Sequence, residues 1–507
     1  MSEIKKPFDI PAHWQWSTFE DIGSWMGGGT PSKRNSSYWE GSIPWVSPKD
    51  MKRAEIRDTQ DHVTEEAIGA SATKMASKDS ILFVTRSGIL EHSLPTARAL
   101  ADVTINQDLK ALTLGDEVDP AFAFYYTRSV EHDILRSCSK DGTTVASLES
   151  SRLYKYPIPL PPLHEQRDIV AKIEELFSNL DAGVDGLQTA QKQLERYRLS
   201  VLQAAVEGRL TAGWRRENPD VEPADKLLER ILEERRDYWE KTYRWERYDS
   251  KGKEPPSGWK SRFKTFERPD ASSLSDLPDT WAWAQMRQVG DVQLGRQRAP
   301  KYHEGENMVP YLRVANVFED RIDTEDVKEM HFSERDYQKY RLKHGDILLN
   351  EGQSLELVGR PAMYRGTPPN ACFQNTLIRF RGYPSLRREY ALLVFRAYMH
   401  TGRFADVARQ TTSVAHLGST RFSKMAFPLP PLSEQRVIVN EAERLLSVGG
   451  AAAGTVETEQ ARAGRLRQSI LKEAFRGRLV GSGASVPASA AAGGDGVAPG
   501  AQMGLGL

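Results

Sequence analysis

The segment PIPLPPLHEQRDIV at residues 157–170 recurs as FPLPPLSEQRVIV at residues 427–439. The shared letters of the two copies lie 269 residues apart, and the same offset aligns residues 200–210 with 469–479. Upstream the offset drifts to 266 and 267, for example where residues 80–83 align with 346–349. A repeat this long predicts a duplicated domain, because solenoid units span only about 20 to 50 residues. We therefore expect two variable blocks, each followed by a fixed block.

The composition is that of a polar chain with no global preference for nucleic acid. Its 507 residues, 27% of them charged, carry a formal net charge of +0, so a nucleic-acid role must come from local patches. Apolar runs such as residues 391–395 are far shorter than the ~18 residues of a membrane span, and the N-terminus is too polar for a signal peptide. We expect a cytoplasmic protein with no membrane partner. Cys138 and Cys372 lie outside any Cys/His cluster, which predicts ordinary buried or half-buried thiols and no metal site or disulfide.

The distribution of apolar runs and turn-rich stretches along the chain predicts an α+β fold with two repeated globular domains and long helices. In the variable blocks, short apolar runs alternate with turn-rich stretches, which is typical of short strands and long loops. The expected segments are a globular domain at 1–160, a helix at 161–213, an additional helix and linker at 214–270, a second globular domain at 271–428, a second helix at 429–480 and a disordered tail at 481–507. The tail is assigned from its Ala, Gly, Ser and Pro content.

The first fixed block has the seam of a coiled-coil-like helix. Spacings of three and four, with one extra four that indicates a stutter, relate Ile173, Leu176, Leu180, Val184, Leu187, Leu194 and Val201, with Gln191 and Arg198 at two polar seam positions. Such a helix needs a partner, and the second fixed block is the obvious one. A solvated single helix is the alternative, against which the equal length of the two copies argues.

The partner seam is much smaller in volume. Transferring the register gives Ala442, Leu445, Gly449, Ala453, Val456, Gln460, Ala463 and Ile470. Large residues facing Ala and Gly would let the two axes approach closely. Because each glycine costs about 1 kcal/mol in a helix relative to alanine, we predict that the second helix is kinked or frayed near residues 449–454.

A further helix is predicted between the repeats. Alternating spacings of three and four relate Leu228, Ile231, Arg235, Tyr238, Thr242 and Trp245, and Pro223 is placed to begin the helix in its first turn. The charge run at 233–236 is expected to form a solvated face. Residues 251–276 are predicted to be a linker.

Several motifs together resemble the specificity (S) subunit of type I restriction-modification enzymes, over about residues 10–480. The first block has GGTPS at 28–32, Tyr38-Trp39, Gly41, IPWV at 43–46, INQDLKAL at 105–112 and GTT at 142–144, and each repeat closes with PLPPL-x-EQR. The second block departs from this pattern: residues 295–298 are GRQR where the first block has GGTP, and residues 311–314 are YLRV. This departure places the second block in a different specificity lineage of the same fold.

The resemblance implies two target recognition domains, each reading half of an interrupted double-stranded DNA sequence, held apart by an antiparallel pair of helices. Because the two blocks differ, the two half-sites are expected to differ. The resemblance also implies two modification subunits that bind S-adenosylmethionine and methylate adenine, and restriction subunits that cleave by ATP-driven translocation. S-adenosylmethionine, ATP and Mg are therefore expected in the partner subunits, and no cofactor or chemistry is expected in this chain.

The motifs of the competing enzyme classes are missing. An adenine methyltransferase needs an Asn/Asp-Pro-Pro-aromatic loop and a glycine-rich turn, which residues 367–370 and 27–29 do not provide. No Walker sequence is present, and nuclease-like pieces such as residues 326–328 are short enough to arise by chance. The alternatives kept open are a stand-alone DNA-binding regulator and, less favoured, a self-sufficient methyltransferase or nuclease. Co-purification of a modification subunit in a ratio of about 1:2 would distinguish the S subunit from a regulator.

Candidate DNA contacts are polar side chains in loops next to the shared motifs. Arg and Lys bond to guanine, Asn and Gln bond to adenine, and further cations bind phosphates. The candidates are Lys33, Arg34, Lys49, Arg86, Lys110 and Thr143 in the first block, and Arg296, Arg298, Lys301, Arg313, Asn316, Gln353, Arg360 and Thr412 in the second. Each could equally be a solvated surface residue. A turn hydrogen bond is as open as a phosphate contact for the two threonines.

Two recurring features favour the fold over base reading. Gln107 and Gln374 are equivalent in the two repeats, and equivalent residues are more suited to holding the fold than to reading different bases. The paired tryptophans at 14 and 16 and at 281 and 283 begin each domain, which predicts core packing.

The helix length fits a molecule in which the globular blocks read DNA and the helices hold them at a set distance. A helix of roughly 45 residues extends ~65 Å at about 1.5 Å per residue, so major-groove segments about one helical turn, ~35 Å, apart are reachable. The helices are therefore expected to act as a ruler that sets the spacer between the half-sites.

Overall fold

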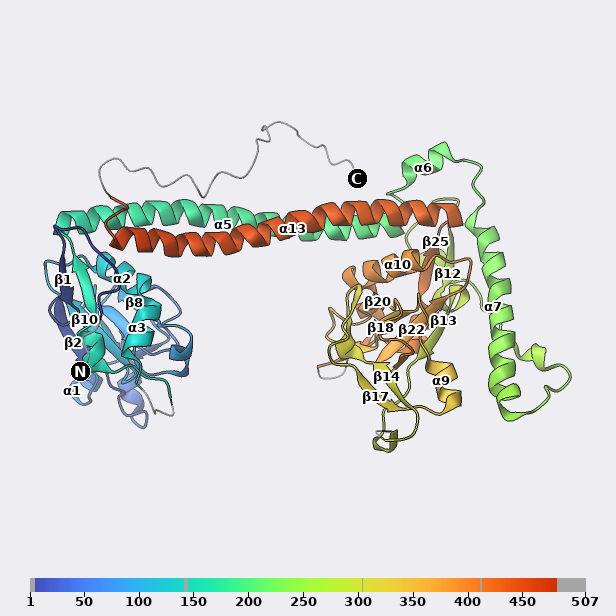
Figure 1. The fold of residues 1–507 in the computed structure, drawn as a ribbon, viewed down its shortest axis with the longest axis horizontal. Helices are drawn as coiled ribbons and strands as arrows, with labels where there is room; N and C mark the ends of the chain where they lie inside the picture. Colours follow the sequence, from blue (N-terminus) through green and yellow to red (C-terminus); the bar gives the residue numbers. More distant parts are fainter. Residues whose placement is uncertain (1–4, 141–144, 303, 411–412, 481–507) are drawn as a thin grey trace. The chain divides into compact units, whose positions relative to one another are not determined.

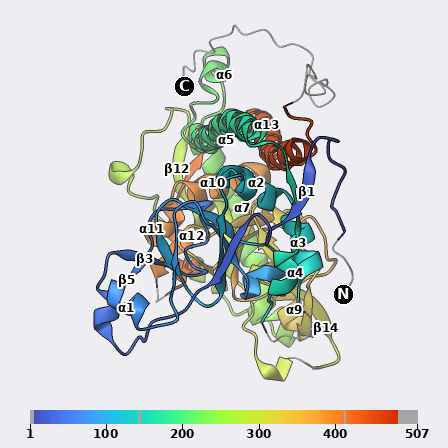
Figure 2. The same ribbon diagram turned by 90° about the vertical axis from the view of Figure 1, so that its left-hand side faces the viewer.

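The computed structural model describes residues 5–140, 145–302, 304–410 and 413–480, and its fold is mixed α and β (Figure 1 and Figure 2). The predicted disordered tail lies outside the described residues. The chain divides into two compact units. Of the described residues, unit 1 holds those up to Thr189 and those from 456 to 480, and unit 2 holds Ala190–Thr455. Each unit contains one globular domain and parts of both long helices, which confirms the predicted fold class.

The globular domain of unit 1 is built from a five-stranded, a four-stranded and a two-stranded sheet around a hydrophobic core. Its strands are β1 (Gln15–Thr18), β2 (Gly23–Gly27), β3 (Ile43–Val46), β4 (Glu55–Ile56), β5 (Asp61–Val63), β6 (Met75–Ala76), β7 (Ile81–Val84), β8 (Thr96–Ala99), β9 (Val103–Ile105), β10 (Leu109–Leu114) and β11 (Pro157–Leu160). Its helices are η1 (Ser36–Trp39), α1 (Glu65–Gly69), η2 (Gly88–Glu91), α2 (Pro120–Ser129), α3 (Glu131–Cys138) and α4 (Ser150–Tyr154). One sheet has the order β2-β10-β7-β8-β4 and the other the order β5-β3-β9-β6, while β1 pairs with β11. All four residues of β7 are buried, because this apolar run is the central strand and is covered on both faces.

The globular domain of unit 2 has more and shorter strands. They are β12 (Ala282–Gln285), β13 (Gly290–Leu294), β14 (Met308–Leu312), β15 (Val317–Phe318), β16 (Arg321–Ile322), β17 (Lys328–His331), β18 (Ile347–Asn350), β19 (Gly352–Gln353), β20 (Pro361–Met363), β21 (Cys372–Phe373), β22 (Leu377–Gly382), β23 (Arg409–Gln410), β24 (Ala415–His416) and β25 (Ala426–Leu429). The helices are α8 (Met286–Val289), η6 (Pro300–Tyr302), η7 (Val314–Asn316), α9 (Glu334–Tyr340), α10 (Arg388–His400), α11 (Arg403–Val407) and α12 (Ser419–Lys424).

The two domains share one strand topology. The order β13-β22-β18-β20 in unit 2 repeats β2-β10-β7-β8 in unit 1, and β17-β14-β21 repeats β5-β3-β9. The parallel pairing of β3 with β9 also recurs, between β14 and β21. The aligned segments 80–83 and 346–349 fall on the matching strands β7 and β18. The duplication predicted from the sequence is therefore confirmed at the level of the fold.

Two long helices, α5 (Leu163–Val206) and α13 (Leu432–Phe475), pass through both units. In unit 1, the early residues Ile169 and Ile173 of α5 share a core with the late residues Ile470 and Leu471 of α13. In unit 2, the late part of α5 shares a core with the early part of α13. Early residues of one helix thus meet late residues of the other, so the pair is antiparallel.

The predicted seams are confirmed by burial, but the predicted fraying of the second helix is wrong. Every seam residue predicted for either helix is buried or half-buried. Residues 449–454 are α-helical, as is the rest of α13. A Cβ atom added to Gly449 would lie 3.3 Å from the ring of Tyr197 on α5. The glycine therefore makes room for a packed tyrosine, and this packing overrides the low helix propensity of the glycine.

The additional helix is α7 (Ala224–Arg247), and Pro223 immediately precedes it as predicted. Short helical segments surround α7: α6 (Ala212–Glu217), η3 (Asp249–Lys251), η4 (Trp259–Arg262) and η5 (Ala271–Ser273). The expectation of a wholly solvated charge run at 233–236 is wrong for two residues. Arg235 is 7% exposed and lies 4.6 Å and 4.4 Å from the ring centroids of Phe263 and Phe266. Glu234 accepts a hydrogen bond of 3.0 Å from a backbone N–H of the globular domain. The predicted linker packs on α7, so this face of the helix is covered.

Cys138 and Cys372 are buried free thiols, as expected, and burial raises the pKa of both to about 12. Both side chains are therefore in the protonated, unreactive form at neutral pH. Within the described part of the chain, no helix is both long enough and apolar enough to cross a membrane.

Candidate nucleic-acid interface

The glycine-rich loop after β2 presents two exposed cations from a fixed backbone. A Cβ atom on Gly28 would lie only 2.1 Å from the carbonyl oxygen of Ile105, so glycine alone fits there. The indole Nε1 of Trp45 donates to the carbonyl of the next glycine at 3.0 Å. Lys33 and Arg34 follow and are exposed. This loop therefore offers what a DNA contact requires, namely exposed positive charges held on a fixed backbone.

The other candidate DNA contacts in unit 1 differ in their exposure and in the contacts that their charged groups make within the protein. Arg86 is exposed just after β7. Lys49 is exposed, but its ammonium pairs with Asp61 at 2.7 Å. Lys110 is half-buried on β10, and its ammonium lies 5.9 Å from the ring centroid of Tyr154. Of the three, Arg86 alone combines exposure with the lack of an ion pair or ring contact among the described residues.

The candidates in unit 2 are more enclosed. Arg298 is exposed on the loop between β13 and η6. Lys301 lies in η6, and its side chain is outside the described residues. Gln353 is half-buried on β19. Arg360 is half-buried, its guanidinium lies 4.8 Å from the ring centroid of Phe318, and burial lowers its pKa.

The structure places Arg296 in the interior, which corrects its prediction as a DNA contact. Only 7% of the residue is exposed. Its guanidinium pairs with Asp336 at 2.9 Å and lies 3.9 Å from the ring centroid of Tyr302, and it also donates to the carbonyl of His331. A buried charge must be paired and hydrogen-bonded, and this arginine uses its donors inside the domain.

Asn316 is also interior, and its prediction as a DNA contact is corrected in the same way. It is 2% exposed, and its side-chain oxygen accepts a 3.1 Å hydrogen bond from the backbone N–H of Arg313. Its amide nitrogen donates to the carbonyls of Asp323 and Asp326 at 3.1 and 3.0 Å. These bonds close the loop after β14. The guanidinium of Arg313, half-buried on the same loop, pairs with Asp326.

The glutamines that recur in the two domains do not have identical surroundings. Gln107 is exposed and its side chain accepts a hydrogen bond from Thr30, so it fastens the loop after β2. Gln374 is half-buried, and its backbone forms a β-bridge with the loop after β13. The remaining candidates, Thr143 and Thr412, lie outside the described residues.

The repeated signature joins each globular domain to its helix through a tryptophan and a glutamate. Trp14 donates from its indole nitrogen to Glu165 at 3.0 Å, and Trp281 donates to Glu434 at 2.9 Å. Both tryptophans are buried, at 4% and 6% exposure, and the second tryptophan of each pair is half-buried. The predicted core role is confirmed for Trp14 and Trp281, whereas Trp16 and Trp283 lie outside the core clusters. The glutamate partners of Trp14 and Trp281 were not identified from the sequence.

The glutamine of the signature makes a second repeated link. Gln166 and Gln435 are buried at 1% and 0% exposure. Each side-chain oxygen accepts from the backbone N–H that precedes α2 or α10, at 2.8 and 2.9 Å. Each side-chain nitrogen donates to a proline carbonyl of the signature, at 3.0 and 3.1 Å. Their identity in both copies was the signal for this role, but the sequence did not reveal the partners.

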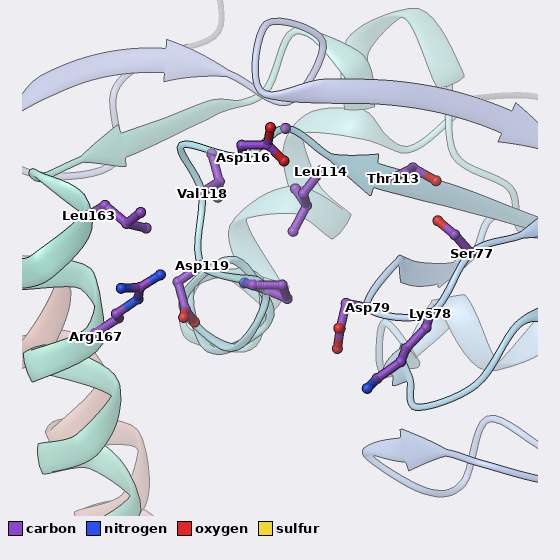
Figure 3. Close-up of a pocket in the computed structure, with 12 residues that line it drawn as sticks. Ser77, Lys78, Asp79, Thr113, Leu114, Asp116, Val118, Asp119, Leu163 and Arg167 are labelled. Atoms are coloured by element: carbon purple, nitrogen blue, oxygen red, sulfur yellow. The ribbon is translucent and has the colours of Figure 1, made fainter.

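The arginine of the signature remains exposed in both copies, at Arg167 and Arg436. In unit 1, Arg167 lines a cavity of about 290 Å³ between the first turn of α5 and loops of the globular domain. Figure 3 places Lys78, Asp79 and Asp116 around the same space. The cavity carries both signs of charge, and none of the predicted DNA contacts lines it. Within the described ranges, no group of three His, Cys, Asp or Glu side chains is arranged to hold a metal ion.

A family model, the type I restriction modification DNA specificity domain, matches residues 11–195 and 278–446. The chain belongs to this family. Each matched range of this specificity-domain protein starts just before the paired tryptophans and ends within a long helix. Residues 196–277, which include α6 and α7, fall between the two ranges.

The curated relatives that the chain resembles are named as specificity subunits. The EcoR124I/EcoR124II specificity subunit of Escherichia coli is 40% identical over 189 residues, covering 36% of this chain and 47% of the relative. The EcoKI specificity subunit of Escherichia coli strain K12 is 25% identical over 361 residues, covering 71% and 65%. The chain therefore spans from about half to just under two thirds of the length of these relatives.

Two solved structures share the fold. A chain from a structure of the type I R-M system, solved to describe complex assembly and conformational transition, has a TM-score of 0.62 at 19% identity, covering 93% of this chain and 100% of that one. The HsdS subunit from Thermoanaerobacter tengcongensis has a TM-score of 0.50 at 19% identity, covering 93% and 99%. At this identity, the likeness concerns the fold.

Proposed function

We propose that this chain is the DNA sequence-specificity subunit of a type I restriction-modification complex, and that it reads a bipartite, asymmetric site in double-stranded DNA. The observation that carries the proposal is the combination of a shared strand topology with different loop side chains in the two globular domains. Shared topology gives both domains the same way of approaching DNA. Different loops then give them different sequences to recognise.

The exposed cations define where each domain would meet DNA. Lys33, Arg34 and Arg86 in the first domain and Arg298 in the second are exposed in loops at the ends of strands. Arginine is suited to the paired acceptors of guanine in the major groove, and lysine is suited to phosphates. We assign base reading to these loops rather than to the interior residues Arg296 and Asn316.

The fixed blocks would serve as docking surfaces for the partner subunits. The signature links of Glu165 and Gln166 recur at Glu434 and Gln435, so the chain offers two equivalent surfaces to two copies of one partner. These partners would be two modification subunits, together with restriction subunits. The partners would supply S-adenosylmethionine, ATP and Mg, and this chain would perform no chemistry of its own. The complex would act in the cytoplasm, where its DNA substrate is found.

The test is methylome sequencing of a host that expresses this chain with its modification subunit. The expected result is adenine methylation at an interrupted motif with two different half-sites, together with co-purification of the two chains in a ratio of about 1:2. Methylation by this chain alone, or DNA binding with no modification subunit recovered, would contradict the proposal.

A further inference from the structure

Residues 241–264, here called the basic arm, carry a concentrated positive charge outside the two globular domains. They contain eight Lys and Arg and three Asp and Glu, a net charge of +5 in a chain whose formal net charge is +0. The arm consists of the end of α7 and the segment that follows it. It lies between the two ranges that match the family model, so the shared domain gives it no role.

The arm has a small aromatic core of its own. The ring of Trp239 stacks on Tyr243 and Trp259, with centroid distances of 4.7 and 5.8 Å. Tyr243 and Trp259 lie 6.0 Å apart with rings parallel to within 3°, and Phe263 meets Trp239 edge-on at 5.3 Å. These contacts fold the segment after α7 back onto the helix. The Lys and Arg side chains of the end of α7 and of the segment that follows it are thereby brought close together.

The part of α7 that precedes the arm is fixed to the second globular domain. Leu228 and Ile231 of α7 are buried at 1% and 0% exposure in the core of unit 2. In Figure 1, α7 extends from the side of unit 2 near α13 toward the end where β14 and β17 lie. The loop between β13 and η6 carries Arg298, the exposed candidate DNA contact of the second domain. The arm is therefore a firmly attached extension of the unit that holds this loop.

Several cations of the arm have no counter-ion within the described part of the protein. Lys260 pairs with Glu240 at 2.6 Å and Arg244 pairs with Asp249 at 3.2 Å. By contrast, among the residues that the structure describes, the exposed side chains of Lys241, Lys251, Lys253 and Lys264 form no ion pair. Four exposed ammonium groups on one small structure repel one another unless an anionic ligand is present.

We propose that the basic arm binds the phosphate backbone of duplex DNA beside the half-site that the second globular domain reads. Lysine ammonium groups are flexible point charges, which suits phosphates and carries no sequence information. The aromatic rings stack on one another, so they are not free to stack on the unpaired bases of a single strand. This inference rests on the proposed function and adds to it an anchoring surface outside the recognition loops.

The test compares two four-residue variants of the full chain, each in complex with its modification subunit. The arm variant is K241Q/K251Q/K253Q/K264Q. The matched control is R216Q/K226Q/R365Q/R387Q, which removes the same charge from exposed positions of unit 2 outside the arm and outside the two long helices. Affinity for labelled duplexes with and without the methylated motif is measured by fluorescence anisotropy between about 50 and 200 mM salt.

For the arm variant, the slope of log affinity against log salt is expected to become shallower by about 0.9 for each phosphate that the arm no longer neutralises. Affinity should fall by the same factor on both duplexes, and the preference for the motif should be unchanged. A slope equal to that of the control would overturn the inference, as would weaker co-purification of the modification subunit at an unchanged slope. If the unaltered complex shows no preference for any motif, the proposed function fails instead, whatever the arm variant does.

Discussion

At the scale of single residues, the two copies of the signature show how one side chain can be used in two settings. Glu434 is fully buried and binds Trp281, Thr211 and Arg215. Its counterpart Glu165 is partly exposed and binds Trp14 and His13. Repetition in the sequence identified both glutamates as part of a fixed feature. Their partners come from segments distant in the sequence, so contacts of this kind could not be predicted.

Glu319 provides a residue-scale prediction about pH. Burial alone would raise the pKa of Glu319, but a hydrogen bond from His400 and the charges of His400, Arg198 and Arg396 lower it to about 2 from the usual 4.5. Each pKa unit corresponds to about 1.4 kcal/mol, so the ionised form contributes stability on the order of 3 kcal/mol. Because the folded-state pKa is the lower one, this contribution is present above about pH 4.5 and is lost as the pH falls toward 2.

The E319Q variant should therefore unfold at a lower urea concentration than the unaltered chain at pH 7, and this difference should shrink by about half or more at pH 3. E356Q, which changes an exposed glutamate of the same unit, is the control and should have little effect at either pH. If E319Q and the unaltered chain differ equally at both pH values, the account is contradicted. The pKa of Glu319 would then not be lowered by His400, Arg198 and Arg396.

At the scale of elements, the spacing of apolar residues predicted which helix residues are buried. The position of a polar residue in a loop predicted its exposure poorly. The seam of α5 and its transferred register on α13 were both correct, because burial on a helix follows from spacing alone. The fraying expected at Gly449 failed because the ring of Tyr197 packs there, which spacing does not reveal. Among the DNA candidates, Arg296 and Asn316 looked like exposed loop residues, and their burial depends on tertiary partners.

Two neighbouring glycines test the packing of the helix pair. A Cβ atom on Gly450 meets nothing within 4 Å, whereas one on Gly449 would press on Tyr197 at 3.3 Å. G450A should stabilise α13 by about 0.5 to 1 kcal/mol through helix propensity. G449A should gain less or lose stability, because the tyrosine ring must shift. Urea unfolding and amide exchange in residues 446–454 would measure both, and equal gains would contradict the packing.

At the scale of the whole molecule, the repeat at an offset of 269 residues contains two parts that have diverged to different degrees. The part with a constant offset became the two long helices and their links to the domains. The part with a drifting offset kept its strand order and changed its loops, as the order β13-β22-β18-β20 illustrates. The sequence could establish the duplication and indicate the family, but not which candidate loop residues are exposed and which are buried by tertiary partners.

The helices are expected to act as a ruler, which an insertion can test. Adding about four residues, roughly one turn, after Thr189 in α5 and after Thr455 in α13 lengthens both helices by ~6 Å. With ~3.4 Å per base pair, the spacer between half-sites should grow by about one to two base pairs, and both half-sites should stay the same. Methylome sequencing would detect this, and altered half-site bases with an unchanged spacer would contradict the ruler.

The central claim is that each globular domain reads its own half-site, and a duplication of the first domain tests it most directly. Residues 290–417 are replaced by residues 23–148, so that β2 takes the place of β13 and both domains carry the same loops. Co-purification of the modification subunit verifies that the variant folds and assembles. Methylome sequencing should then reveal the first half-site twice, as an inverted repeat with the original spacer. Retention of the original second half-site would contradict the account.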